Sequence, residues 1–308
     1  MDVKKTEKDG RFTMFLKHFL AGTVAGWAQV LVGQPFDTVK VRLQTASEAK
    51  YSGSMDCVKK ILVNEGIRGF YKGTTVPLIG IGACVSVQFV ALSQSKDMFM
   101  RYNMRRAEER SEKPVVGLTL PQVTIAGIIS GIANGPLSTI IEHIRIRLQV
   151  QSGQSVSPFK LMPQIVRTFG WRALWKGWNA TYCREIPGFG FYILTYELAI
   201  RAATPKDKTV NDVGSAALLL CGSLSGLGMW LTCYPLDVVK SRIQSDSLDR
   251  ATAEYKSTLD CWKKTFRAGG VRAFYKGFWA CILRSMPVNG ATFLAYELAI
   301  RMMGGREV

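Results

Sequence analysis

Apolar residues are concentrated in six long stretches of the chain, separated by polar and charged segments. The stretches cover residues 14–44, 74–101, 120–149, 178–202, 213–244 and 279–302. Each reaches or exceeds the ~20 residues that an α-helix needs to cross a bilayer. Their glycines, serines, glutamines and occasional charges suit helices that face one another or a wet cavity better than helices that face lipid. The pattern therefore predicts an all-α membrane protein.

The odd-numbered stretches end in closely similar residues, which indicates an internal repeat. In each, an acidic residue is followed three positions later by a basic residue and seven positions later by a glutamine. The acid–base pairs are Asp37 and Lys40, Glu142 and Arg145, and Asp237 and Lys240, and the glutamines are Gln44, Gln149 and Gln244. Matching segments lie about 100 residues apart, and a fixed period is the signature of a repeat architecture. We therefore expect three repeats, at residues 14–104, 117–204 and 212–303.

The three acid–base pairs predict a gate. An acid and a base at the end of a lipid-length apolar helix are costly unless they meet partners. Three pairs at matching positions of three repeats can satisfy one another in a ring. Such a ring of ion pairs can close a path between the helices and open it again.

Glycines with GxxxG spacing precede each acid–base pair. They are Gly22 and Gly26, Gly127 and Gly131, and Gly222 and Gly226. In lipid, small residues one turn apart let helix backbones approach closely. We expect all three glycine pairs to lie at contacts between helices.

A second shared motif, an aromatic residue followed by lysine and glycine, precedes each even-numbered stretch. Its lysines and glycines are Lys72 and Gly73, Lys176 and Gly177, and Lys276 and Gly277. Backbone N–H groups at the start of the following helix, assisted by the helix dipole, can bind the phosphate of an anionic lipid. The alternative is an aromatic anchor at the membrane surface with a lysine that extends toward water. Only the first repeat has an acid, Glu65, before the glycine that opens this region.

The even-numbered stretches end in acid–base pairs of another kind. Glu197 with Arg201, and Glu297 with Arg301, are spaced four residues apart on one helix face. A single pair of this kind is usually a solvated helix end, but two at matching positions predict a second, weaker gate on the side opposite the first. The first repeat lacks the acid and has only a base, Lys96, so this gate is expected to be incomplete.

The net charge of +17 leaves two classes of protein to compare. Nucleic-acid binding is disfavoured because the basic residues lie mainly between apolar stretches and are not interleaved with base-stacking aromatics. A membrane protein whose connecting loops carry lysine and arginine fits both the charge and the apolar stretches. We expect no nucleic-acid partner.

The cysteines and histidines carry no sign of chemistry. The seven cysteines are scattered without metal-binding spacing, as expected of small apolar filler. The sequence has no nucleophile triad, Walker loop or metal cluster, so we expect no enzyme activity, no cofactor and no metal site. Residues 1–11 resemble neither a secretory signal nor a transit peptide, so targeting to an organelle is expected to be internal.

The repeated motifs resemble those of the mitochondrial carrier family, Pro-x-[Asp/Glu]-x-x-[Lys/Arg] three times, each followed by aromatic-Lys-Gly. Two copies keep the proline, as Pro35 and Pro235, whereas the second has Ile140 there. The resemblance covers almost the whole chain. It implies six tilted transmembrane helices in three pseudo-symmetric repeats, three short matrix helices, and termini in the intermembrane space. The first ring would be the matrix gate, braced by the three glutamines, and the second pairs would form the cytoplasmic gate.

The same resemblance implies a monomeric, multi-pass protein of the mitochondrial inner membrane with cardiolipin contacts. One central site would be exposed to either side alternately and would exchange a small-molecule substrate for a counter-substrate. Parallel repeats about an axis along the membrane normal are a known transporter plan. An ion-pair gate opens when the substrate binds the intermediate conformation a few kcal/mol better than the closed one.

In this family the substrate is bound midway along the even-numbered helices, where Gly80, Arg184 and Arg284 occupy matching positions. Glu185 follows Arg184, and an arginine–acid pair at mid-membrane is expensive and by default functional. Arginine binds a carboxylate through two hydrogen bonds, glutamate accepts an ammonium or quaternary amine, and Gly80 leaves room for a side chain or tail. The alternative is that Arg184 and Glu185 only neutralise each other, which on this reasoning leaves Arg284 unpaired.

An arginine followed by an acid at this place resembles the amino-acid and carnitine branch of the family, as does the run at residues 33–44. Adenine nucleotides are disfavoured because no arginine-rich run follows Lys240, and keto acids or phosphate because neither explains Glu185. We therefore expect exchange of amino acids or related zwitterions, with carnitine/acylcarnitine exchange as the alternative. A scaffold or proton-leak protein that kept the fold is a third class.

Overall fold

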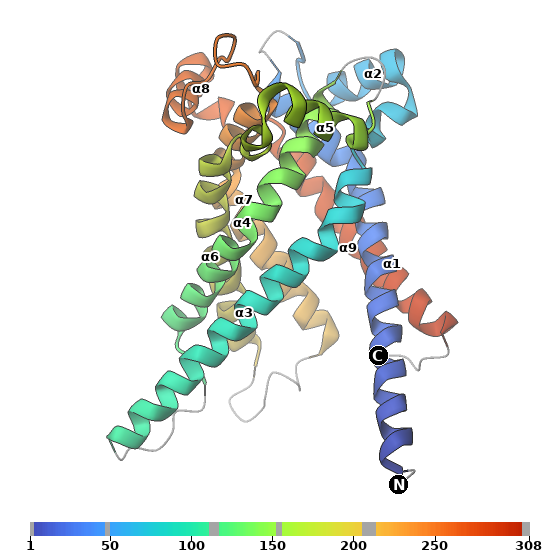
Figure 1. The fold of residues 1–308 in the computed structure, drawn as a ribbon, viewed down its shortest axis with the longest axis vertical. Coiled ribbons are helices and arrows are strands. Elements are labelled where there is room, and N and C mark those ends of the chain that lie inside the picture. The colour runs from blue at the N-terminus through green and yellow to red at the C-terminus, as the bar shows by residue number, and fades with distance from the viewer. Residues whose placement is uncertain (1–2, 47–49, 111–116, 152–155, 205–213, 304–308) are drawn as a thin grey trace. The chain divides into compact units, whose positions relative to one another are not determined.

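The structure, a computed structural model, describes residues 3–46, 50–110, 117–151, 156–204 and 214–303, and in these ranges it is helical without a strand. The long helices are α1 (Val3–Thr45), α3 (Thr75–Glu109), α4 (Leu120–Val150), α6 (Trp178–Ala203), α7 (Ser215–Ser245) and α9 (Phe278–Met302) (Figure 1). The short helices are α2 (Ser54–Glu65), α5 (Pro158–Phe169) and α8 (Thr258–Ala273), and η1 (Ile67–Tyr71) and η2 (Trp171–Trp175) are 3-10 turns. The expectation of an all-α protein is confirmed.

Each apolar stretch of the sequence forms one long helix, and each short helix lies between an odd and an even stretch. Two helical segments among the described residues, Ile67–Glu109 and Leu120–Val150, are long and apolar enough to cross a membrane. The apolar pattern therefore located the helices well, because a helix of this length needs a continuous apolar face to be stable.

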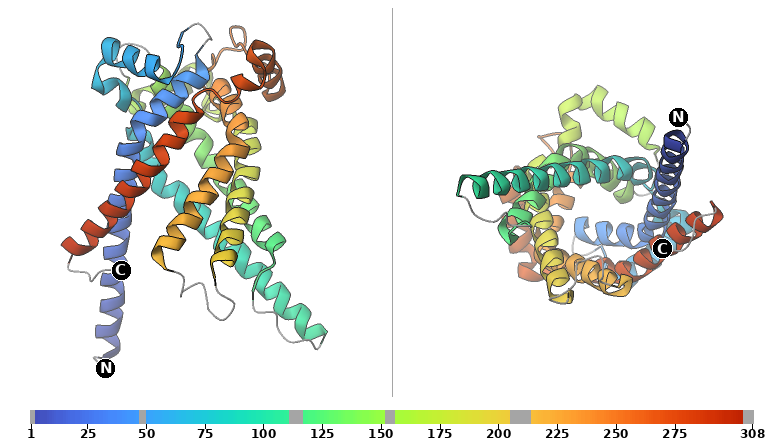
Figure 2. Two further views of the ribbon diagram at one scale, coloured as in Figure 1. Left: turned by 180° about the vertical axis from the view of Figure 1, so that it is seen from behind. Right: turned by 90° about the horizontal axis from the view of Figure 1, so that it is seen from below.

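The chain forms two compact units, and helices α3 and α4 each contribute to both. Unit 1 consists of Met1–Gly82, Leu148–Ser155 and Gly277–Val308, and unit 2 consists of Ala83–Arg147 and Val156–Lys276. In unit 1, α1 packs along α9 and also contacts α2 and η1. In unit 2, α6 packs along α7, which also contacts α8 (Figure 2).

Each unit has a small apolar core. In unit 1 it lies where α2 meets the end of α1, and in unit 2 it lies where α8 meets the end of α7. The core of unit 1 contains Val39 and Leu43 of α1, Cys57 and Ile61 of α2, Phe70 of η1 and Ala280 of α9. The core of unit 2 contains Ala180 of α6, Val239 and Ile243 of α7, Cys261 of α8, and Phe274. The gate-bearing ends of α1 and α7 are therefore held by side-chain packing on one flank.

The cysteines act as filler in these cores. All seven are free thiols, and Cys57 and Cys261 are fully buried. Burial raises the pKa of Cys57 to about 11 and that of Cys261 to about 12. Both remain protonated at neutral pH, and a buried thiol without thiolate character is unreactive.

The glycines of the aromatic-Lys-Gly motif adopt a left-handed backbone conformation. Their φ angles are 77° at Gly73, 84° at Gly177 and 81° at Gly277. Side chains are disfavoured at such angles because the Cβ crowds the backbone. Each glycine turns the chain from a short segment into the next long helix, which explains the repeated residue type.

The GxxxG stripe of α4 lies at a close helix contact. A Cβ added at Gly131 would be 2.9 Å from the backbone oxygen of Glu185, and one at Gly127 would be 3.0 Å from that of Phe189. At the corresponding glycines of α1 and α7, an added Cβ would lie within 4 Å of no described atom; these are Gly22, Gly26, Gly222 and Gly226. The expectation of three equivalent glycine contacts is therefore wrong for the residues described, because only the glycines of α4 face a neighbouring backbone at close range.

We expect Gly131→Ala to destabilise the protein by about 1–3 kcal/mol, because the obstructing atom is backbone and α4 must move away from α6. Gly26→Ala is the matched control. It should leave stability unchanged or raise it by up to ~1 kcal/mol, because alanine has the higher helix propensity. Thermal unfolding of the two purified variants in detergent measures this, and equal melting temperatures would contradict the close α4–α6 contact.

Candidate functional site

The six charges of the predicted first gate are divided between the two units. Asp37 and Lys40 belong to unit 1, and the other four belong to unit 2. Within unit 2, the Lys240 ammonium of α7 forms an ion pair with the Glu142 carboxylate of α4. One base of the third repeat thus meets the acid of the second, as a ring of ion pairs between repeats requires.

Arg184 of α6 joins this ion pair. Its Nη2 lies 3.4 Å from Oε1 of Glu142, and its Nε lies 3.9 Å from Oδ1 of Asp237. The same Nη2 also forms an ion pair with the adjacent Glu185. Both Arg184 and Glu185 are buried, at 7% and 1% exposure. The structure therefore brings half of the predicted substrate site directly against the gate.

Arg284 and Gly80 lie in unit 1, and Arg284 is not unpaired. The Nε of Arg284 lies 3.4 Å from Oδ1 of Asp37, the gate acid of α1. The argument that neutralisation of Arg184 by Glu185 would leave Arg284 alone is therefore wrong. Gly33 of α1 makes this approach possible, because a Cβ there would be 3.4 Å from the Arg284 guanidinium. In both units a predicted substrate arginine contacts a gate carboxylate.

The three glutamines of the repeat are fully buried. Gln149 donates a hydrogen bond from Nε2 to the Thr38 hydroxyl, at 3.4 Å, and Gln244 donates one to the Thr181 hydroxyl, at 3.2 Å. Gln44 is buried at the matching place on α1. Their expected role as braces of the gate pairs stays a prediction.

The charges of the predicted second gate pair within their own helices. On α6, Arg201 Nε donates to Oε1 of Glu197 at 2.8 Å; on α9, Arg301 Nη2 donates to Oε1 of Glu297 at 2.5 Å. Arg201 also donates to the backbone oxygen of Leu118. Both arginines are about half exposed, and Lys96 is partly buried on α3. A gate made of these residues stays a prediction.

The lysine of the first aromatic-Lys-Gly motif does not extend toward water. Lys72 is 6% exposed, and its Nζ lies 2.6 Å from Oε2 of Glu65 and 3.0 Å from the backbone oxygen of Gln151. Arg42 holds the same carboxylate through two hydrogen bonds, of 2.6 and 2.8 Å, and donates from Nε to the backbone oxygen of Gln149. The alternative of a lysine that extends toward water is therefore wrong for Lys72, which lies in a buried cluster of one acid and two cations.

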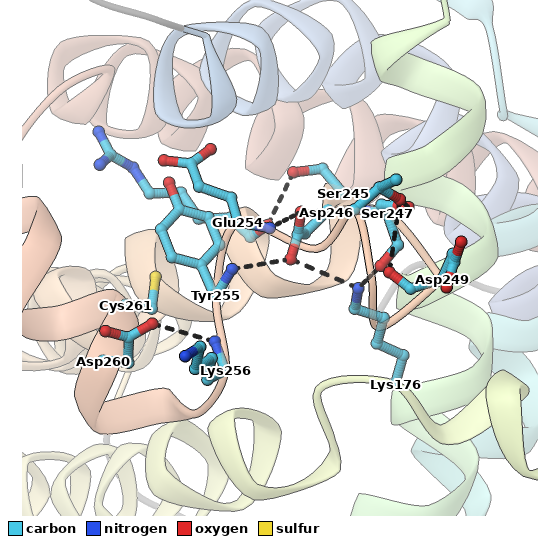
Figure 3. A network of polar contacts seen from close by, with 12 residues as sticks. Lys176, Ser245, Asp246, Ser247, Asp249, Glu254, Tyr255, Lys256, Asp260 and Cys261 are labelled. Atoms are coloured by element: carbon cyan, nitrogen blue, oxygen red, sulfur yellow. Dashed lines mark hydrogen bonds and ion pairs between the residues drawn. The ribbon is translucent and has the colours of Figure 1, made fainter.

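The second copy of the motif has its lysine in a similar place with a different acid. Lys176 forms an ion pair with Asp246, at 3.6 Å, and donates to the backbone oxygen of Ser247 (Figure 3). Burial lowers the pKa of Lys176 below its usual value, and Asp246 opposes that shift. Binding of lipid by Gly73, Gly177, Gly277 and the third lysine, Lys276, stays a prediction.

Sequence reasoning gave no role to several residues with defined contacts, among them Glu65, His143 and Asp246. Glu65 was visible as the one acid that precedes a motif glycine, but no sequence pattern marks Arg42, 23 positions before it, as its partner. Asp246 lies two residues beyond Gln244, as Gln151 lies two beyond Gln149. Comparing the repeats beyond Gln149 and Gln244 identifies Asp246 as an acid, but only the fold shows which residues it binds.

No group of three or more potential metal ligands occurs among the residues that the structure describes.

Comparison with known proteins places these features in a family. The model of the family described as “Mitochondrial carrier protein” matches residues 13–103, 117–207 and 211–307. The protein belongs to the mitochondrial carrier family. It is therefore a multi-pass protein of the mitochondrial inner membrane that carries small-molecule solutes, in a family of transporters rather than enzymes.

Several relatives of this carrier are similar over nearly the whole chain. The mitochondrial glycine transporter YMC1 of Saccharomyces cerevisiae is 44% identical over 297 residues, which span 94% of this chain and 92% of that protein. The glutamate/glycine mitochondrial carrier ymc1 of Schizosaccharomyces pombe is 42% identical over 297 residues, or 94% of this chain and 95% of that protein. The human mitochondrial carnitine/acylcarnitine carrier protein is 33% identical over 298 residues, or 94% of each.

For this carrier we expect Glu65→Gln to cost roughly 3 kcal/mol at pH 7, because it leaves two buried cations without their shared acid. Burial alone would raise the pKa of Glu65. The hydrogen bonds from Arg42 and Lys72 lower the pKa by more than burial raises it, so the pKa of Glu65 lies below its ordinary value. The carboxylate thus stabilises the fold above the ordinary glutamate pKa of about 4.3 and loses that effect as pH falls through its lowered pKa.

Thermal unfolding of wild type and Glu65→Gln between pH 3 and pH 8 measures this contribution. The gap in melting temperature should be constant at neutral pH and should narrow only in strong acid. Glu108→Gln, a change at an exposed acid of α3, is the control and should leave the melting temperature unchanged. A gap for Glu65→Gln no larger than that of the control would contradict the cluster.

Proposed function

We propose that this carrier exchanges amino acids across the mitochondrial inner membrane by alternating access. The observation that carries the proposal is the position of Arg184, which lies against the carboxylates of Glu185 on its own helix, Glu142 on α4 and Asp237 on α7. A buried cation that touches three acids on three helices has exchangeable partners. A cargo with one carboxylate and one ammonium can replace one of them without leaving a charge unpaired.

A zwitterion fits this arrangement through both of its charges. Its carboxylate takes the Arg184 guanidinium, for which two parallel hydrogen bonds are the favoured geometry. Its ammonium then takes the place of Arg184 beside Glu185, which is 1% exposed and needs a cation when ionised. By the pattern of the family, Arg284 of unit 1 would supply a second guanidinium, and Gly80, which is buried on α3, would leave space for the rest of the cargo.

Binding at such a site acts directly on the gate. Glu142 is shared by Arg184 and Lys240, so a cargo that draws Arg184 away changes the surroundings of the Lys240 pair. Arg284 stands in the same relation to Asp37 in unit 1. The differential affinity that opens a gate then comes from competition between the cargo carboxylate and the gate carboxylates for the same arginines.

The wider architecture belongs to the proposal as well. Helices α1, α3, α4, α6, α7 and α9 would span the membrane in the repeats 14–104, 117–204 and 212–303, with α2, α5 and α8 on the matrix side. The pairs Glu197–Arg201 and Glu297–Arg301, with Lys96, would close the opposite side after re-pairing between helices. The carrier would work as a monomer.

A lipid contact of the carrier is supported by an apolar cavity in unit 1. The cavity has a volume of about 410 Å³ and lies between α1, α2 and α9, where Phe36, Met55, Leu62 and Trp279 contribute to its walls. Gly277 immediately precedes α9, so the start of this helix adjoins an apolar space. An anionic phospholipid such as cardiolipin matches both parts, a phosphate at the helix start and acyl chains in the cavity.

The names of relatives support amino acids such as glycine as the cargo. Those more than 40% identical include proteins named as carriers of glycine or of glutamate and glycine. Glycine is a zwitterion without a side chain, and glutamate adds a carboxylate for which Arg284 is a partner. Glycine is therefore the first substrate to test.

The test is exchange of labelled amino acids by purified protein in liposomes. Wild type should exchange glycine, and Glu185→Ala or Arg284→Ala should slow exchange about 30-fold or more, because removing one partner of a buried charge pair costs at least ~2 kcal/mol. Arg267→Ala, at an exposed position of α8, is the control and should exchange at the wild-type rate.

Two outcomes separate the parts of this proposal. Wild-type rates in both site variants would remove Glu185 and Arg284 from the site. Absence of exchange with every amino acid, in protein that is folded and inserted, would overturn the amino-acid assignment.

Carnitine/acylcarnitine exchange is the second candidate function, because carriers of that name are about one-third identical over 94% of the chain. A quaternary ammonium can occupy the place beside Glu185 and a carboxylate can bind Arg184. Competition in the glycine assay distinguishes the two functions. Strong inhibition by acylcarnitines together with exchange of labelled carnitine would favour this alternative.

A further inference from the structure

Asp246 is the organising residue of the segment that follows α7. Its Oδ1 accepts the backbone N–H groups of Ser247, at 2.8 Å, and Glu254, at 3.0 Å, and its Oδ2 accepts that of Tyr255, at 3.1 Å (Figure 3). Tyr255 in turn packs on the apolar core of unit 2. The carboxylate thus closes a loop of about ten residues and fixes it to the end of α7.

Two cations of the second repeat bind this residue. Lys176 forms an ion pair with its Oδ2 at 3.6 Å and also donates to the backbone oxygen of Ser247. Arg147, near the end of α4, donates from Nη2 to the backbone oxygen of Asp246 at 2.5 Å. The side chains of Lys176 and Asp246 are 17% and 7% exposed. Solvent therefore screens the pair only partly.

His143 holds both cations in place. Its Nε2 accepts a hydrogen bond from Nε of Arg147 at 2.6 Å, so its Nδ1 carries the proton and donates to the backbone oxygen of Leu174 at 3.0 Å. Leu174 belongs to η2, which ends one residue before Lys176. One imidazole therefore orients Arg147 on α4 and ties down the turn that presents Lys176.

Unit 1 contains the same arrangement with its acid in another place. There Arg42 and Lys72 donate to the backbone oxygens of Gln149 and Gln151, just past the gate of the second repeat. Their carboxylate is Glu65, the last residue of α2, before the left-handed Gly66. In both units an arginine and a lysine of one repeat hold the chain that follows the gate of the next.

The second repeat has no acid at the position that corresponds to Glu65. Phe169 is the last residue of α5 and precedes the left-handed Gly170, so it occupies the position of Glu65. In unit 2 the acid lies instead in the segment that follows α7. Asp246 is two residues past Gln244, as Gln151 is two residues past Gln149. The charge balance of the cluster is kept, but the acid now comes from the third repeat.

We propose that Asp246 is a positioning residue for transport, which locks the ends of α4 and α7 together whenever the Lys240–Glu142 gate pair is formed. Lys176 and Arg147 bind Asp246 across the boundary between the second and third repeats. A carrier that opens on this side must separate these repeats and break the contacts. These contacts stabilise the closed gate in addition to the gate ion pairs, and they do not involve the cargo. This role of Asp246 relies on the proposed alternating access but not on the identity of the cargo.

The first experiment measures backbone opening without substrate. In Asp246→Gln, the segment acquires the residue type that unit 1 has at Gln151, and the acid is lost. Hydrogen–deuterium exchange of the full-length carrier in lipid nanodiscs should become about fivefold faster in peptides covering residues 140–150 and 237–247, because a partly exposed ion pair contributes about 1 kcal/mol. Peptides of α1 should exchange at the wild-type rate.

Asp249→Asn is the matched control in the same loop. Asp249 is exposed, and its carboxylate accepts only a local hydrogen bond, from Ala251 N–H, among the contacts described. This variant should leave exchange in both gate peptides unchanged. Equal protection of the gate peptides in Asp246→Gln and wild type would overturn the proposal.

The second experiment moves the acid back to its place in unit 1. Phe169→Glu added to Asp246→Gln offers Lys176 and Arg147 a carboxylate from the end of α5, as Glu65 offers one from α2. The double variant should regain gate protection and the wild-type rate of glycine exchange. Phe169 is 45% exposed, so the added charge has access to water when it is not paired.

Rescue separates a lock from general loss of structure. If Asp246→Gln only damages the loop, an acid at position 169 cannot restore the gate peptides, and failure of rescue would refute the shared role of the two acids. Should Asp246→Gln not fold, Lys176→Gln provides the same test from the other side, with the same faster exchange expected. Wild type that exchanges no amino acid would overturn the cargo assignment alone, because the deuterium measurement needs no substrate.

Discussion

A carboxylate that is even partly buried among apolar helices needs a cation as partner, and in this carrier the partly buried Glu142 is paired with two. Lys240 reaches it from α7 and Arg184 from α6. Removing either partner leaves a charge in a medium that solvates it poorly, at a cost of several kcal/mol. The ends of three helices are therefore held together by one side chain. The gate and the candidate cargo site are parts of one electrostatic cluster.

The same requirement explains how the repeats are joined. In unit 1, Arg42 and Lys72 share the carboxylate of Glu65 on α2, and in unit 2 Lys176 pairs with the carboxylate of Asp246, past α7. Backbone oxygens of the next repeat complete their coordination. Both clusters thus contain one acid and two cations, although the acid occupies different positions in the two units. Local sequence symmetry can thus be broken without loss of the contact between repeats.

Sequence reasoning located the helices and the gate charges because each depends on a periodic feature. The apolar stretch expected at residues 120–149 matches α4, Leu120–Val150, to within one residue. A fixed spacing identifies the acid–base pairs. Reasoning failed where a side chain has several partners within reach. Arg284 was expected to lack a protein partner if Arg184 and Glu185 neutralised each other, yet it lies 3.4 Å from Asp37. Lys72, for which an anchor extending toward water was one of two alternatives, is buried beside Glu65. The GxxxG glycines were expected to be equivalent, yet only those of α4 are close to a described neighbouring helix.

The sequence by itself determined the all-α fold, the repeated gate motif and the arginine–acid pair of α6, since these follow from apolar periodicity and from the cost of charge in lipid. The tertiary structure decided which charges pair. Asp37 and Arg284 form an ion pair although they lie 247 positions apart, and the choice of partner depends on distances of a few ångströms that no local pattern encodes. Lys176 and Asp246 illustrate this, because each is an ordinary polar residue in its own segment and a partner only after α6 and α7 have packed together.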